Sequence, residues 1–230
     1  MMRLIEIRTI LGLLGSLMLI TGCATGERGS DALSESIKWY TGEMGKVDDN
    51  RARQLLERAV ETRDPLATMW LARVYSTGRM TFTANKPQAI IIAESVIEEI
   101  ESLADEGNPE AMFLMGTAFA EGLAKPIDPE LAVVWYRRAA KQGNTLAIHN
   151  MGNVYAAGSG VEQSDEQAVK CWRQAAEKGD VIPQLRLATM YEEGRGTGQD
   201  LDQAIFWYRQ AATRGNSAAA AALSRLGGSQ

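Results

Sequence analysis

The 230-residue chain has one histidine and two cysteines, and this scarcity limits the chemistry that it can support. A structural zinc site takes four Cys, His or carboxylate ligands at close spacing, and no such set surrounds His149. The two cysteines are Cys23 and Cys171, so if Cys23 carries a lipid the chain can form no internal disulfide. We therefore expect no metal site and a fold held together by packing.

Basic residues are too few for a nucleic-acid-binding protein. The chain has 24 Lys and Arg against 29 Asp and Glu, which gives a formal net charge of -5, and its basic residues form no cluster. Nucleic acids are bound by basic surfaces that displace the counterions of the phosphates. This composition excludes nucleic acid from the expected partners.

Catalytic motifs are absent from the sequence as well. It contains no Ser-x-x-Lys, no zincin motif and no nucleophile elbow. Residues 194–198 (GRGTG) have the glycines of a phosphate-binding loop, but they follow a predicted helix and lack the Lys-Ser/Thr ending. Cys171 falls in an aromatic packing column of the repeat described below, which favours an inert thiol over a nucleophile. We expect neither an enzyme nor a bound cofactor.

The first 22 residues differ from the rest of the chain. Arg3 and Arg8 precede an uncharged apolar stretch at 10–20, which as a helix would span about 16 Å, roughly half of a bilayer core. This length is typical of a signal peptide rather than a transmembrane helix. Residues 20–23 (ITGC) then resemble the bacterial lipobox, in which the chain is cut before the cysteine and the thiol carries diacylglycerol.

The lipobox resemblance implies a signal peptide at 1–22 and a lipidated Cys23 whose acyl chains anchor the protein in a membrane. Ala24, rather than Asp, after this cysteine implies sorting to the periplasmic face of the outer membrane. Residues 23–30 are then the lipidated cysteine and a flexible tether of at most about 25 Å. The alternative is an ordinary secretory signal with an incidental cysteine, which would give a soluble periplasmic protein.

The chain repeats itself with a period of 36 residues. Gly-Asn or Gly-Asp pairs begin at positions 107, 143, 179 and 215. An aromatic column, a glycine column and an alanine column keep the same spacing: Phe119, Tyr155 and Tyr191; Gly122, Gly158 and Gly194; Ala139, Ala175 and Ala211. Agreement at so many columns is typical of repeat architectures, in which each unit buries its apolar face against its neighbours.

Each unit predicts two helices joined by a glycine-containing turn. In the unit at 108–143, Asn108 and Pro109 supply an N-cap and a first helical residue. Apolar residues three or four positions apart then lead to Gly122, which accepts the left-handed conformation of a C-cap. A second Asp-Pro signal, at 128–129, begins the second helix.

The same columns divide the rest of the chain. We expect a divergent N-terminal unit at 31–63, a unit with a second helix about two turns longer at 64–107, regular units at 108–143, 144–179 and 180–215, and a C-terminal capping helix at 216–230.

The columns Ala-x3-[Leu/Met]-[Gly/Ala]-x2-Tyr-x2-Gly and Ala-x2-[Trp/Cys]-[Tyr/Trp]-x2-Ala-Ala-x2-Gly resemble the Sel1-like repeat, a cousin of the tetratricopeptide repeat. The resemblance is strong over 64–215 and weaker over 31–63, and Pro183 and Cys171 depart from it. It implies an all-α fold, a right-handed α-solenoid of helix–turn–helix repeats, with a concave face lined by the first helices. It also implies protein binding.

Candidate binding residues are the first-helix positions opposite the packing stripe, because these positions vary between units while the packing columns repeat. They are Trp70, Arg73, Leu114, Thr117, Glu121, Asn150, Asn153, Arg186 and Glu193. Trp and Arg are among the residue types that dominate interface energies. The alternative is that these side chains are merely solvated. A long acidic helix predicted at 87–106 is a second candidate surface.

Three functions fit this pattern. The first is a periplasm-facing lipoprotein that acts as a protein-binding scaffold or adaptor through its concave face. The second is an immunity protein that neutralises a phospholipase effector of type VI secretion, since some periplasmic lipoproteins with this repeat resemble such proteins. The third is binding of cell-wall glycan or β-lactam, which a cysteine-rich branch of the family suggests. The lack of paired cysteines disfavours this third function.

Overall fold

The computed structural model describes residues 29–227. The predicted signal peptide at 1–22 and the predicted lipidation site at Cys23 lie outside this range. The described chain forms twelve α-helices and no strand, so the prediction of an all-α fold is confirmed. The helices are α2 (Gly29–Thr41), α3 (Asp49–Glu61), α4 (Pro65–Thr77), α5 (Lys86–Glu94), α6 (Ile97–Asp105), α7 (Pro109–Glu121), α8 (Pro129–Lys141), α9 (Thr145–Ala157), α10 (Asp165–Glu177), α11 (Val181–Glu193), α12 (Leu201–Thr213) and α13 (Ser217–Arg225).

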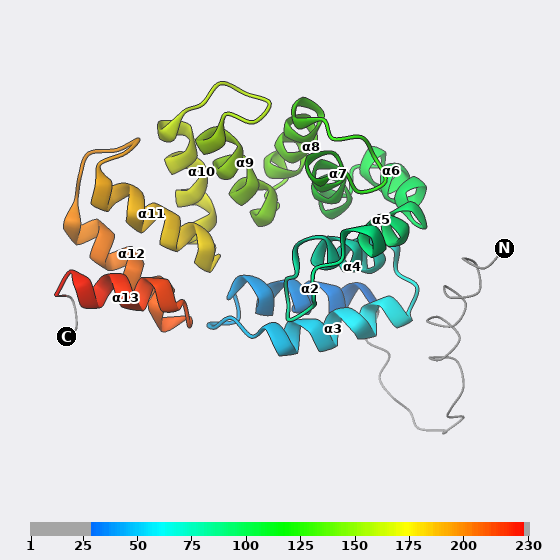
Figure 1. The fold of residues 1–230 in the computed structure, drawn as a ribbon, viewed down its shortest axis with the longest axis horizontal. Helices are drawn as coiled ribbons and strands as arrows, with labels where there is room; N and C mark the ends of the chain where they lie inside the picture. The colour runs from blue at the N-terminus through cyan, green and yellow to red at the C-terminus, as the bar shows by residue number, and fades with distance from the viewer. Residues whose placement is uncertain (1–28, 228–230) are drawn as a thin grey trace.

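Successive helices pack side by side, and the chain bends in one direction along its whole described length (Figure 1). This arrangement confirms the predicted α-solenoid. Short local signals set its helix ends. The Asn108 side chain accepts hydrogen bonds from two backbone N–H groups of the first turn of α7. At the other end, Gly122 has the left-handed φ of 67° expected for a C-cap.

Glycines allow the two helices of a unit to approach closely. A Cβ atom added to Gly116 of α7 would lie 2.5 Å from Cδ1 of Tyr136 on α8. At the equivalent position of the next unit, a Cβ atom on Gly152 would lie 2.5 Å from Cδ1 of Trp172. An aromatic ring therefore packs directly on helix backbone in both units.

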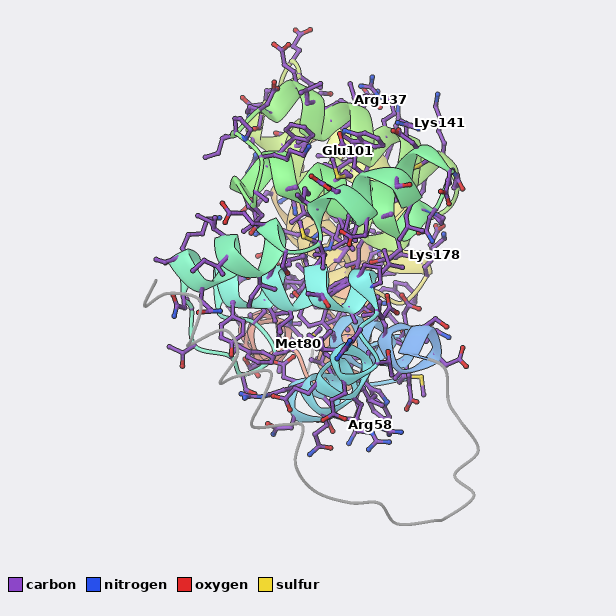
Figure 2. The ribbon with its side chains drawn as sticks, turned by 90° about the vertical axis from the view of Figure 1, so that its right-hand side faces the viewer. Arg58, Met80, Glu101, Arg137, Lys141 and Lys178 are labelled. Carbon is purple, nitrogen blue, oxygen red and sulfur yellow. The ribbon has the colours of Figure 1, made fainter. Side chains whose placement is uncertain are left out.

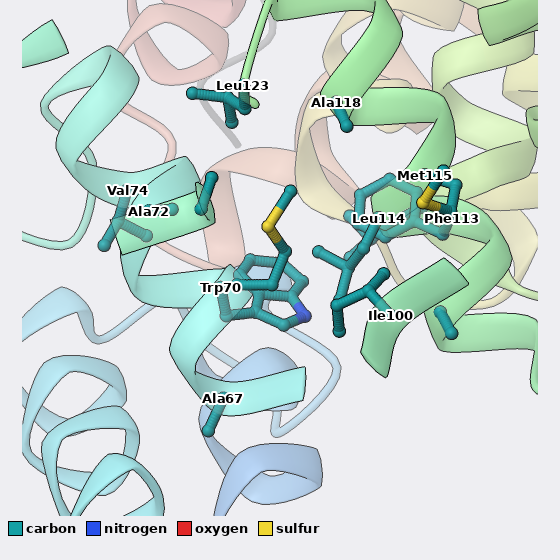
Figure 3. Packing of buried hydrophobic residues seen from close by; sticks show 14 of the residues in the cluster. Ala67, Trp70, Ala72, Val74, Ile100, Phe113, Leu114, Met115, Ala118 and Leu123 are labelled. Atoms are coloured by element: carbon teal, nitrogen blue, oxygen red, sulfur yellow. The ribbon is translucent and has the colours of Figure 1, made fainter. Parts of the chain in front are cut away.

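Part of the main hydrophobic core lies where α4, α6 and α7 meet. Trp70, Ile100, Phe113 and Leu114 are fully buried there, and they lie together in the close view of Figure 3. The ring centroids of Trp70 and Phe113 are 5.9 Å apart. The concave sides of these neighbouring units therefore belong to the core.

The predicted long helix at 87–106 is wrong, because the chain forms two shorter helices, α5 and α6, in this region. The break falls at Ser95 and Val96. The Ser95 hydroxyl donates a hydrogen bond to the Ile92 carbonyl at 2.7 Å, which competes with the backbone pattern of a continuing helix. The break also serves packing, since α5 packs against α4 while α6 packs against α7.

The solenoid closes into a ring, which the sequence patterns do not predict. The closing contact, here called the seam, joins the α2–α3 loop (42–48) to residues 179–181 and 214–215. In the seam, the Val47 N–H donates a hydrogen bond to the Arg214 carbonyl at 3.0 Å. Val47 packs beside the small core that contains Val181. Figure 1 shows α13 returning to the side of the α2–α3 loop.

Several charged side chains lie on the outer surface of the ring. Arg58 of α3 and Arg137 and Lys141 of α8 are exposed and project outward in the side view of Figure 2. Over residues 29–227, no helix is both long enough and apolar enough to cross a membrane.

Candidate partner-binding cavity

Four of the nine predicted binding residues are buried, and for these the expectation of an accessible groove position is wrong. The exposed fraction is 0% for Trp70 and Leu114, 1% for Thr117 and 3% for Arg73. The physical reason is that α4 packs directly against α7. Thr117 also accepts a hydrogen bond from the hydroxyl of buried Tyr136 on α8 at 3.4 Å. The Trp70 indole N–H even donates a hydrogen bond to Glu110 of α7 at 2.6 Å.

Two further predicted residues, Glu121 and Glu193, make structural contacts at the ends of first helices. Glu121 is partly buried, and its carboxylate accepts a hydrogen bond from the Ser76 hydroxyl at 2.7 Å. Glu193 is exposed and forms an ion pair with Arg195 at 3.3 Å. Neither residue lines a cavity described below.

The structure brings together the other three predicted residues, Asn150, Asn153 and Arg186. They line a cavity of about 540 Å³ on the inner side of the ring, here called the central cavity. Its other lining residues come from α2, the α4–α5 loop, α9, α10 and α11, and they are Tyr40, Arg79, His149, Ala156, Ala157, Trp172 and Ile182.

Hydrogen bonds hold several of these side chains in place. Arg79 donates to the Tyr40 hydroxyl at 2.9 Å, which joins the α4–α5 loop to α2. The Trp172 indole N–H donates to the Asn153 side-chain oxygen at 3.2 Å. Arg186 is exposed and has no hydrogen bond or ion pair within the described residues. Its guanidinium is therefore available to a ligand.

The charge of the central cavity is opposite to that of the whole chain. Two arginines line it, and none of its lining residues is Asp or Glu, although the chain has a formal net charge of -5. His149 shares a 2.9 Å contact with the carboxylate of Asp180, which lies outside this lining. The arrangement suits a ligand with negative charge, hydrogen-bonding groups and some apolar surface.

A second cavity of about 340 Å³ adjoins the first and lies at the seam, so it is called the seam cavity. The two cavities share Tyr40, Arg79, His149 and Ile182. The lining of the seam cavity also includes Arg73 and two carboxylates, those of Asp49 and Asp180. The inside of the ring is thus one connected polar region rather than a row of separate grooves.

Arg73 is an unusual buried cation. Its Nε and one of its terminal nitrogens have no hydrogen-bond partner, and its guanidinium lies 4.6 Å from the ring centroid of Trp70. Burial raises the pKa of Glu110 nearby, while hydrogen bonds from Trp70 and Asn144 and the charge of Arg73 oppose that rise. Sequence reasoning selected Arg73 as an accessible groove residue, but it is almost fully buried and reaches only the lining of the seam cavity.

Neither metal binding nor thiol chemistry has support in the described part of the chain. No group of three or more His, Cys, Asp or Glu side chains there is placed to hold a metal ion. Cys171 is partly buried, and burial raises the pKa of its thiol. A raised pKa disfavours the thiolate that nucleophilic attack requires.

Comparison with known proteins places these observations in a family context. The model of the Sel1 repeat matches residues 33–61, 109–144, 145–180 and 184–216. The predicted unit at 64–107, whose second helix is broken in two, is not among the matched segments, whereas the N-terminal unit is. The sequence columns give the opposite result, since they resemble the Sel1 pattern more strongly over 64–107 than over 31–63. A search of curated proteins found no match.

Solved structures show the same fold. A Sel1 repeat protein from Oxalobacter formigenes is 27% identical, with a TM-score of 0.56, over 88% of this chain and 82% of its own. A protective antigen of uropathogenic Escherichia coli with an SLR fold is 26% identical, with a TM-score of 0.54, over 84% of this chain. The match covers 47% of that antigen, about half its length. An immunity protein from Pseudomonas aeruginosa is 21% identical, with a TM-score of 0.48, over 92% of this chain and 78% of its own. At that TM-score the likeness supports no conclusion about this chain.

Proposed function

Because the chain belongs to the Sel1 repeat family, we propose that it is a protein-binding adaptor that holds a segment of a partner protein in its central cavity. The observation that carries this proposal is the lining of that cavity. It combines the amides of Asn150 and Asn153 with the rings of Tyr40 and Trp172 and the free guanidinium of Arg186.

These groups suit a polypeptide ligand. A side-chain amide both donates and accepts hydrogen bonds, so it can pair with the N–H and C=O groups of an extended backbone. Aromatic rings with a polar edge supply contact area at low cost in conformational entropy. The cavity volume of about 540 Å³ lies within the range of about 300–1,000 Å³ that ligand-binding cavities occupy.

The lipobox-like residues 20–23 support a protein anchored through Cys23 at the periplasmic face of the outer membrane. The tether would then keep the ring within about 25 Å of the membrane surface, so the partner would be an envelope protein or a protein that acts at the membrane. A soluble periplasmic form is the alternative. Incorporation of radiolabelled palmitate into the wild-type chain and its loss in Cys23→Ser separate the two.

Site-specific photocrosslinking in cells tests the binding site. We would place a photoreactive amino acid at Asn150 or Asn153 in the cavity, with exposed Arg137 on the outer surface as the control position. Leu114, which the sequence alone recommends, is fully buried and unsuitable for this purpose. We expect both cavity positions to capture the same partner and Arg137 not to capture it. Capture from Arg137 alone would contradict the proposed site.

The identity of the captured protein separates two versions of this function. Resident envelope proteins would support the adaptor. A secreted phospholipase effector would instead establish the immunity function, in which the ring binds and neutralises a toxin.

A further inference from the structure

The central cavity is built from both ends of the solenoid. Tyr40 and Arg79 come from the N-terminal units, while Asn150 and Arg186 come from α9 and α11 in the C-terminal half. These two groups of residues face the same space only because the ring is closed. Opening the seam would separate them and divide the binding site.

The seam itself has few stabilising contacts. They include one backbone hydrogen bond, from Val47 to Arg214, and apolar contact of Val47 with the small core around Val181. Charges across the seam oppose one another, because the carboxylate of Glu43 is repelled by Asp180 and attracted by Lys178. A ring closed by so small a contact gains substantially from any ligand that touches both sides.

Positive charge is the property that both sides of the cavity share. Arg186 has no partner within the described residues, and Arg79 on the opposite side is paired only with the neutral Tyr40 hydroxyl. In the adjoining seam cavity, Arg73 keeps two nitrogens without a hydrogen-bond acceptor. Arginine pairs most strongly with planar oxyanions such as carboxylates. The carboxylate of Asp180 is already engaged with His149 and with the first turn of α11.

We propose that an acidic segment of the partner binds in the central cavity, pairs with Arg79 and Arg186 together, and thereby holds the ring closed. This inference rests on the proposed adaptor function and adds the chemistry of the ligand. The shared chemistry is a carboxylate, which the segment can supply from Asp or Glu side chains or from a free C-terminus.

Peptide binding to the purified full-length protein in detergent tests whether the cavity prefers a ligand that carries carboxylates. The probes are three fluorescein-labelled peptides: hexaglutamate with an amidated C-terminus, hexaglutamine with an amidated C-terminus, and hexaglutamine with a free C-terminus. We expect fluorescence anisotropy to show binding of one or both carboxylate-bearing peptides and not of amidated hexaglutamine. The first peptide reports side-chain carboxylates and the third reports the terminal one. Equal binding of amidated hexaglutamine would overturn the proposal.

Matched variants locate the interaction. Loss of one hydrogen-bonded charge pair weakens binding by about tenfold or more, so we expect this loss in both Arg79→Gln and Arg186→Gln. Arg137→Gln, which removes an exposed arginine from the outer surface, should leave the affinity unchanged. Affinity that is insensitive to Arg186→Gln would also overturn the proposal. Because Arg186 is exposed, its replacement should not impair folding.

Hydrogen–deuterium exchange of the Val47 amide tests the closing of the ring, because this amide donates across the seam. If the peptide binds only the closed ring, a peptide concentration ten times the dissociation constant should slow this exchange about tenfold. Unchanged exchange at saturation would refute the closing role.

Failure of this inference can be distinguished from failure of the proposed function. If Asn150 and Asn153 capture a partner but the acidic peptides do not bind, the adaptor stands and the acidic ligand is wrong. If the acidic peptides bind in the cavity but crosslinking from it captures no protein, the adaptor function is wrong.

Discussion

Closure of the ring can be tested by comparing two glycines of the α2–α3 loop. Gly42 and Gly45 have similar positive φ values of 87° and 93°. A Cβ atom on Gly42 would lie 2.5 Å from Cγ2 of Val181 across the seam, whereas a Cβ atom on Gly45 meets nothing within 4 Å. Gly42→Ala therefore perturbs the seam and the backbone, and Gly45→Ala perturbs the backbone alone.

The expected magnitudes follow from these contacts. An alanine in the left-handed conformation lowers the free energy of unfolding by about 1–2 kcal/mol, and this effect is common to both variants. Gly42→Ala adds an overpacking cost of about 1–3 kcal/mol against Val181. The added cost cannot exceed the free energy of ring closure, because the ring can open and relieve the clash. For a chain of this length, 1 kcal/mol corresponds to roughly 2–4 °C in melting temperature.

The assay combines urea unfolding with small-angle X-ray scattering. We expect Gly42→Ala to be less stable than Gly45→Ala, to have a larger radius of gyration, and to exchange the Val47 amide faster. If the two variants had the same stability, scattering and exchange, the seam would not be formed in solution and the reasoning would be refuted.

Three further predictions concern the interior of the described chain. Gly152→Ala should lower the free energy of unfolding by about 1–3 kcal/mol in urea titrations, because its Cβ would lie 2.5 Å from the Trp172 ring; unchanged stability would show that the helix pair can separate freely. Burial raises the pKa of Glu110 in the folded state, so the protonated form favours folding. The stabilisation is complete below the unfolded-state pKa and is lost as pH rises through the folded-state pKa. Denaturation at several pH values should show this pH-dependent part of the free energy of unfolding in wild type and not in Glu110→Gln. If the free energy of unfolding depended on pH in the same way in both proteins, the assignment to Glu110 would be contradicted. Iodoacetamide should modify Cys171 more slowly in the folded protein than in urea, as mass spectrometry can measure, because burial raises the pKa of the thiol; equal rates would show that burial does not protect it.

Helix positions in the regular units were predictable because their causes are local. An Asn or Asp N-cap needs only the first turn of its own helix, and Gly122 needs only the turn that follows α7. The helix break at Ser95 and Val96 was not predictable in this way. It depends on two halves that pack on different neighbours, α4 and α7, which no period within one segment reveals.

The candidate site was predictable in part. Asn150, Asn153 and Arg186 occupy the inner side of the ring, as the offset from the packing stripe suggested, and they line one cavity. Trp70 and Leu114 satisfy the same offset and are fully buried. The pattern of one helix defines which side faces inward, but it does not define how closely the next inner helix approaches.

The sequence alone determined the all-helical class, the Sel1 repeat and the regular helix ends, because hydrogen bonds and packing between near neighbours produce them. Only the tertiary structure decided the seam and the cavities. Small rotations between successive units add along the solenoid, and their sum brings Val47 to Arg214. This sum also places Arg79 beside the same cavity as Arg186. It depends on every interface in the chain, so no single repeat encodes it.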